Sequence, residues 1–105
     1  MKVGVTSQNF RTITGHAGKT RRFIIYEADN EGIKEVERLD LPKEMAMHNF
    51  QGTEHPIDRV DYLITESCGP GFINRMKSRG IAVITTAETV PETAVATLIK
   101  EHLPQ

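Results

Sequence analysis

Apolar residues fall into five short runs that have the length and composition of β-strands. These runs cover residues 2–6, 22–28, 33–41, 61–66 and 81–85. The segment Asp29-Asn30-Glu31-Gly32, between the second and third runs, is rich in residue types that form tight turns. The third run is ambiguous by itself, because its apolar spacing suits either a strand or a helix. The preceding turn favours a strand, so we expect an antiparallel hairpin.

Two later segments have a helical period. Residues 72–79 should form a short amphipathic helix with Phe72, Ile73 and Met76 facing inward, followed by a helix-ending glycine at Gly80.

The residues between 7 and 20 have the composition of a loop, and a loop this long is often functional. Residues 43–59 should form an irregular crossover with room for one short helix.

The last helix has the clearer boundary signals. Thr89 and Glu92 have the spacing of a capping box, and Pro91 lies in the first turn, where proline is tolerated. Pro104 should end the helix. One face is expected to carry the residues that recur with the helical period: Val95, Leu98, Ile99 and His102.

The order of these elements is three strands, a crossover, and then strand, helix, strand, helix. The first three strands should form an antiparallel meander, and a right-handed crossover makes the last two strands parallel to each other. A mixed five-stranded sheet of order 3-2-1-4-5 satisfies both conditions. We therefore predict one α/β domain over residues 1–105, with a ribonuclease H-like three-layer fold and helices packed on the sheet.

Composition narrows the possible functions. The net charge is −1, which argues against a dedicated nucleic-acid-binding protein. Cys68 is the one cysteine, so the chain cannot form an internal disulfide. Its cysteine content therefore gives no indication of an oxidising compartment. The N-terminal residues lack the apolar run of a signal peptide, and no stretch is long and apolar enough for a membrane span. We expect a cytoplasmic location and no membrane partner.

Soft ligand residues follow three of the predicted strands. His16, His48 and Cys68 each lie after a strand whose carboxyl end should reach the same sheet edge. Imidazole and thiolate groups are ligands that suit iron and iron–sulfur clusters. His55 lies before the fourth strand, near the opposite edge, and is the weaker candidate. Each histidine could also be an ordinary loop or packing residue, and Cys68 could be a small buried hydrophobe.

The segment Cys68-Gly69-Pro70-Gly71 is a second candidate feature. A glycine-rich turn that opens a helix offers backbone N–H groups to an anion, and it can lower the pKa of a nearby thiol. The same glycines could instead serve only a tight strand-to-helix turn. No Gly-Lys-Ser/Thr follows, so the signal is weaker than that of a phosphate-loop motif.

Two catalytic classes are disfavoured by the residues. Nucleases of the ribonuclease H-like type need several carboxylates around the first strand to hold magnesium, and residues 2–6 contain none. Asp61 and Glu66 flank the fourth strand at opposite ends and cannot share a metal ion. The chain also lacks the nucleophile-elbow motif of serine hydrolases. We therefore expect a binding protein and not an enzyme.

The order of these motifs resembles the dinitrogenase iron–molybdenum cofactor family, which includes NifX, NafY and the C-terminal domain of NifB. The resemblance covers roughly residues 1–99. It rests on the initial Val-Gly-Val-Thr-Ser strand, on the glycine-rich turn and on Gly80-Ile81. Two further segments carry it: His16-Ala17-Gly18-Lys19-Thr20-Arg21-Arg22-Phe23, and His55-Pro56-Ile57 followed by Val60-Asp61-Tyr62-Leu63-Ile64.

The resemblance implies transient binding of an iron–sulfur or iron–molybdenum cluster or its precursor, in nitrogen fixation or a related pathway. It places the family's cofactor-binding histidine at His16. From the chemistry, we expect His48, His55 and Cys68 as further metal ligands, and Arg21, Gly69 and Gly71 as anion-stabilising groups. A cluster-assembly or acceptor protein would be the partner. The alternatives are a regulatory or protein-interaction module that binds no metal, and an enzyme acting on a small anion at the Cys68 turn.

Overall fold

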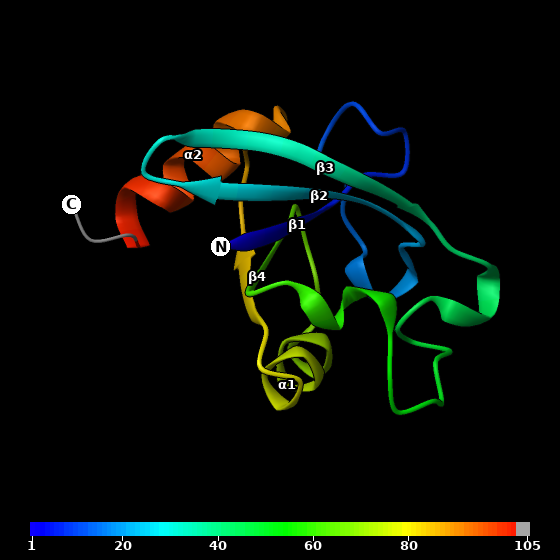
Figure 1. Cartoon of the computed structure of the whole chain (residues 1–105). Coiled ribbons are helices and arrows are strands. Elements are labelled where there is room, and N and C mark those ends of the chain that lie inside the picture. Colours follow the sequence, from blue (N-terminus) through cyan, green and yellow to red (C-terminus); the bar gives the residue numbers. More distant parts are fainter. Residues whose placement is uncertain (103–105) are drawn as a thin grey trace.

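Five strands form one mixed sheet within residues 1–102, the part of the chain that the computed structural model describes. Their order is β3-β2-β1-β4-β5, which confirms the predicted order (Figure 1). The strands are β1 (Lys2–Thr6), β2 (Arg22–Asp29), β3 (Gly32–Asp40), β4 (Tyr62–Thr65) and β5 (Ala82–Thr85).

β1 lies at the centre of the sheet because its two edges accept different partners. On one side it pairs antiparallel with β2, which pairs antiparallel with β3. On the other side it pairs parallel with β4, which pairs parallel with β5. Val5, for example, lies opposite Ile24 on β2 and opposite Ile64 on β4. The carboxyl ends of β1, β3 and β4 consequently reach one edge of the sheet.

The helices α1 (Pro70–Ser78) and α2 (Pro91–His102) lie on opposite faces of the sheet (Figure 1). Successive side chains of β2 point to opposite faces of the sheet. Phe23 and Ile25 belong to the core that contains α1, while Ile24 and Tyr26 belong to the core that contains α2. This double burial explains why β2 reads as a continuous apolar run and not as an alternating one. The crossover packs on the α1 face.

The predicted burial of Ile73 in α1 is wrong. Phe72 and Met76 are buried as predicted, but Ile73 is 42% exposed. Phe72 and Met76 are four residues apart and share a face, whereas Ile73 is turned about 100° away from Phe72. The helix also begins earlier than residue 72, with Pro70 in its first turn and Gly69 as N-cap. Gly80 has φ +79°, the left-handed conformation expected after a helix.

The predicted capping box at α2 is also wrong. The Glu88 carboxylate accepts hydrogen bonds from the N–H groups of Thr89 and Val90, at 3.0 Å each. Glu92 instead accepts a bond of 3.2 Å from the buried Tyr26 hydroxyl. The helix starts at Pro91, which is one position too late for Thr89 to be its N-cap. The helix end predicted at Pro104 lies outside the described residues.

The crossover between β3 and β4 contains two short 3-10 helices, Lys43–Met45 and Pro56–Arg59, where the sequence indicated one short helix. The chain between them is irregular and packs on the α1 face through Met47 and Phe50. None of the helices in residues 1–102 has the length and apolar character that crossing a membrane requires.

Candidate functional site

An open pocket of about 410 Å³ lies where three separate segments of the chain meet at the carboxyl edge of the sheet. His16, His48 and Cys68 all line this pocket. The remaining lining residues are Ala17, Gly18, Lys19, Ser67 and Gly69. The structure therefore brings together three of the four ligand residues proposed from the sequence, although they are far apart along the chain.

A buried group of threonines attaches the loop that carries His16 to the end of β4. The hydroxyls of Thr6 and Thr65 are 2.9 Å apart and both side chains are fully buried. Both hydroxyls lie within hydrogen-bond distance of the Thr14 carbonyl oxygen, at 2.6 and 3.2 Å. The N–H of Glu66 donates to the same oxygen at 3.1 Å. This convergence sets the position of the loop relative to residues 66–69.

His16 has an unusual backbone conformation for a residue with a side chain. Its φ of 54° and ψ of 53° lie in the left-handed region. Its N–H donates to the hydroxyl of Ser67 at 3.1 Å, and its carbonyl accepts from the N–H of Lys19 at 2.9 Å. The side chain is exposed and lines the pocket. Such conformations recur at functional sites, where the surrounding structure maintains them.

His48 is oriented by a single carbonyl group. Its backbone N–H and its ring Nδ1 lie 2.9 and 2.8 Å from the carbonyl oxygen of Gly18. A carbonyl oxygen can only accept, so Nδ1 carries the proton. In the neutral ring, Nε2 then has the free lone pair. This is the tautomer and the type of anchoring that metal-binding histidines use.

Cys68 is half-buried, and burial raises the pKa of its thiol. The expectation that the glycine-rich turn lowers this pKa is therefore wrong, because desolvation disfavours the thiolate. A metal ion would have to displace the thiol proton on binding. Gly69 is the N-cap of α1 and lines the pocket, whereas Gly71 lies beyond it.

The cation beside the pocket is Lys19 and not Arg21. Arg21 is half-buried, is not among the residues that line the pocket, and uses its backbone N–H in a bond of 3.4 Å to Gln8. Lys19 occupies the short 3-10 helix Ala17–Lys19, which starts directly after His16. Residues 7–26 contain four arginine or lysine residues and no carboxylate, a charge pattern that was visible in the sequence.

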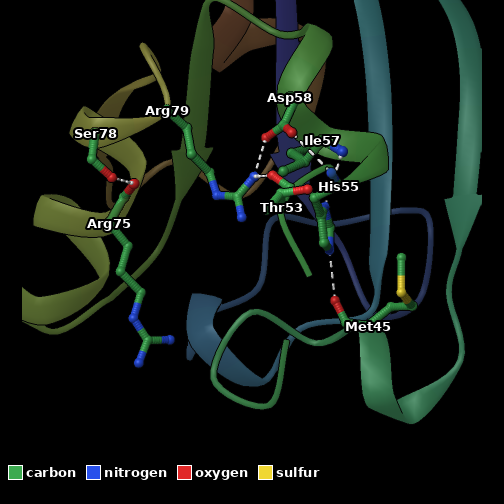
Figure 2. A network of polar contacts seen from close by, with 8 residues as sticks. All are labelled: Met45, Thr53, His55, Ile57, Asp58, Arg75, Ser78 and Arg79. Atoms are coloured by element: carbon green, nitrogen blue, oxygen red, sulfur yellow. Dashed lines mark hydrogen bonds and ion pairs between the residues drawn. The ribbon is translucent and has the colours of Figure 1, made fainter. Parts of the chain in front are cut away.

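His55 lies outside the pocket and both of its ring nitrogens are already occupied (Figure 2). Nδ1 accepts from the N–H of Ile57 at 3.0 Å, and Nε2 lies 2.6 Å from the carbonyl oxygen of Met45. The ring is buried and packs edge-on against Phe50. His55 is the N-cap of the helix Pro56–Arg59, so the structure separates it from the other candidate ligands.

Asp58 completes the capping box with His55 and joins it to α1. Its carboxylate accepts from the backbone N–H of His55 at 2.8 Å and from Arg79 at 2.6 Å, and Figure 2 shows the Asp58 and Arg79 side chains pointing toward each other. Partial burial acts to raise the Asp58 pKa, but the His55 hydrogen bond and the Arg79 ion pair outweigh it and lower the pKa below 3.8. The folded state therefore favours the ionised carboxylate.

We expect Asp58 to contribute to acid sensitivity. Because its pKa is lower in the folded state, its contribution to stability is full well above the unfolded pKa of 3.8, and it is lost progressively as the pH falls from that range through the folded pKa. The difference in free energy of unfolding between the wild type and Asp58→Asn should shrink between pH 5 and about pH 2. Urea unfolding at several pH values measures this difference. A constant difference across that range would contradict the assignment.

The candidate ligands are not arranged around a single ion. Within residues 1–102, no three His, Cys, Asp or Glu side chains converge closely enough to hold one. His16, His48 and Cys68 instead share the lining of one open pocket.

Comparison with known proteins identifies one family and solved structures of similar fold. The model of the family described as dinitrogenase iron–molybdenum cofactor matches residues 1–101. The crystal structure of PH0822 has a TM-score of 0.73 at 22% identity, covering 96% of this chain and 92% of that chain. The NMR structure of TM1290 from Thermotoga, described as a candidate NifB protein of the DUF35 family, has a TM-score of 0.59 at 18% identity, covering 94% and 87%. No curated protein matches the chain.

Proposed function

Because the chain belongs to the dinitrogenase iron–molybdenum cofactor family, we propose that it binds and carries an iron–sulfur or iron–molybdenum cluster, or a precursor, during cofactor assembly or delivery. The sheet order and the helices on both faces support the further assignment of a ribonuclease H-like fold. The cluster is cargo that arrives and leaves, and a cluster-assembly or acceptor protein is its donor or recipient.

One observation supports this function above all others: His16, His48 and Cys68 line the same open pocket. They come from the loop after β1, the crossover after β3 and the turn after β4. Both imidazoles are exposed and the thiol is half-buried, so all three groups are accessible to cargo in the pocket. Imidazole nitrogen and thiolate sulfur are suitable terminal ligands for iron.

We assign His16 as the principal ligand because its exposed ring can approach cargo directly. His48 presents Nε2 as the second nitrogen ligand, and Cys68 provides the sulfur. One cysteine cannot supply the four thiolates that usually hold an iron–sulfur cluster in a protein. Few protein ligands and an open pocket suit weak, reversible binding, which handover to another protein requires.

Two other functions make different predictions. A regulatory or protein-interaction module of the same fold would bind no metal. An enzyme acting on a small anion would use the turn at Cys68, and its turnover would depend on the thiol without added metal. The raised pKa of the thiol and its half-buried position argue against a reactive nucleophile at neutral pH.

Anaerobic reconstitution with iron and sulfide, followed by visible absorption, tests the proposal. Wild-type protein should develop cluster absorption bands, and His16→Ala should weaken cluster binding by about tenfold or more. His102→Ala is the matched control, because this exposed histidine lies at the end of α2, away from the pocket. It should leave the bands unchanged.

Equal bands in the wild type and in His16→Ala would show that His16 is not a ligand. The absence of bands from wild-type protein, both after reconstitution and after addition of a preassembled cluster, would favour the interaction module. Turnover of a small anion that is lost in Cys68→Ala and needs no metal would favour the enzyme.

A further inference from the structure

Ser67 connects the two sides of the pocket. It lies beside Cys68, yet its hydroxyl and its carbonyl oxygen both bind the opposite segment, and the carbonyl oxygen also accepts from the Thr65 hydroxyl at 3.2 Å. Its hydroxyl accepts from the N–H of His16 at 3.1 Å, and its carbonyl accepts from the N–H of Ala17 at 3.2 Å. These two bonds join the segment that carries one candidate ligand to the segment that carries another.

The Ser67 hydroxyl binds the residue whose backbone is strained. A non-glycine residue in the left-handed region costs roughly 1–2 kcal/mol, so His16 needs compensating interactions to stay there. The hydrogen bond from its N–H to Ser67 is one of them. If this bond were lost, the backbone of His16 could relax and its ring would move relative to Cys68.

Gly15 makes room for this contact. A Cβ atom at position 15 would lie 2.4 Å from the Ser67 hydroxyl oxygen, well inside contact distance. Any side chain at position 15 would therefore force the hydroxyl to rotate away from His16. The Ser67 hydroxyl thus occupies space that is free because residue 15 is a glycine, so the two positions depend on each other.

We propose that Ser67 is a positioning and binding residue of the cargo site. It holds His16 at a fixed orientation relative to Cys68 by accepting the His16 N–H. The hydroxyl has its own proton to donate, and Ser67 lines the pocket, so this proton is available to an anionic sulfur or oxygen atom of the cargo. This role rests on the proposed carrier function.

The surroundings of Ser67 favour an anion as its partner. Among residues 1–102, Lys19 is the charged side chain that lines the pocket, and the Glu66 carboxylate next to Ser67 lies outside this lining on the side of Gly15. A hydroxyl donor beside a cation is a suitable combination for a negatively charged atom. Ser67 therefore adds anion recognition to a site whose histidines provide nitrogen ligands.

The first experiment needs no metal. Amide hydrogen exchange measured by NMR should show the His16 amide proton exchanging about tenfold faster in Ser67→Ala than in the wild type, because its acceptor is gone. Ser67→Thr keeps the hydroxyl and should restore most of the protection. Ser78→Ala removes a serine hydroxyl that bonds to the Arg75 carbonyl within α1, and it should have no effect on His16.

A double-variant cycle separates positioning from general destabilisation. Gly15→Ala should accelerate exchange of the His16 amide as Ser67→Ala does, because both remove the same hydrogen bond. The double variant should be no worse than Gly15→Ala alone, since the clash disappears when the hydroxyl is absent. Additive effects, or His16 amide protection in Ser67→Ala equal to that of the wild type, would overturn the positioning role.

The second experiment titrates a preassembled iron–sulfur cluster into the same variants and follows visible absorption. Ser67→Ala should bind about fivefold more weakly, the effect of losing one hydrogen bond, and Ser67→Thr should recover most of the affinity. Equal affinity in the wild type and Ser67→Ala would overturn the binding role. If wild-type protein binds no cluster, the proposed function fails, while the exchange experiment still decides the positioning role.

Discussion

His55→Ala is expected to lower the free energy of unfolding by about 3 kcal/mol. The substitution removes the helix cap on Ile57 and the bond from Nε2 to the Met45 carbonyl, and it leaves both partners unsatisfied. It also removes a buried ring that packs against Phe50. Each lost bond to a partly buried group costs about 1 kcal/mol or more, and the lost packing adds to this. Chemical denaturation measures the loss.

His48→Ala is the matched comparison, because it replaces an exposed histidine on the same crossover. It should cost less than about 1 kcal/mol in stability, but it should weaken cluster binding. His55→Asn should retain part of the stability, since asparagine is a good N-cap. If His55→Ala were as stable as His48→Ala, the structural role given to His55 would be wrong.

Thr65→Val should cost about 2 kcal/mol in unfolding free energy. The shape of the side chain is kept, but the buried hydroxyl that approaches Thr6, the Thr14 carbonyl and the Ser67 carbonyl is lost. The loop that carries His16 would be held less firmly against the end of β4. We therefore expect weaker cluster binding as well as lower stability.

Thr97→Val provides the control for this substitution. Its hydroxyl bonds to the Thr93 carbonyl on the exposed side of α2, so the change should fall within about 0.5 kcal/mol. Thr6→Val should resemble Thr65→Val, and the double variant should cost less than the sum because the two hydroxyls bind each other. Simple additivity would show that the threonines act independently.

Most of the fold could be predicted from local patterns. The hairpin formed by β2 and β3 follows from apolar runs on either side of Asp29-Asn30-Glu31-Gly32, and the sheet order follows from right-handed crossovers. The helix boundaries were less accurate. Pro91 lies in the first turn of α2 as predicted, but Thr89 and Glu92 do not form the predicted capping box, because Glu92 instead contacts Tyr26, 66 residues away. Sequence spacing cannot reveal such a competitor.

The candidate site was predictable to a similar extent. His16, His48 and Cys68 could be grouped because the carboxyl ends of β1, β3 and β4 meet at one edge. Ser67 and Lys19 were missed as pocket residues, since neither has a motif of its own. The sequence favours Arg21 as the anion-stabilising cation, but Arg21 lies beyond the short 3-10 helix Ala17–Lys19 that borders the pocket.

The sequence by itself determined which segments form strands and which edge of the sheet collects the imidazoles and the thiol, because apolar period and chain connectivity are local properties. Only the tertiary structure decided what each polar group does there. Burial raised the pKa of Cys68, a carbonyl selected the tautomer of His48, and two hydrogen bonds made His55 a structural residue. These outcomes depend on partners that are distant in the chain, and desolvation and hydrogen bonding act only once such partners are in contact.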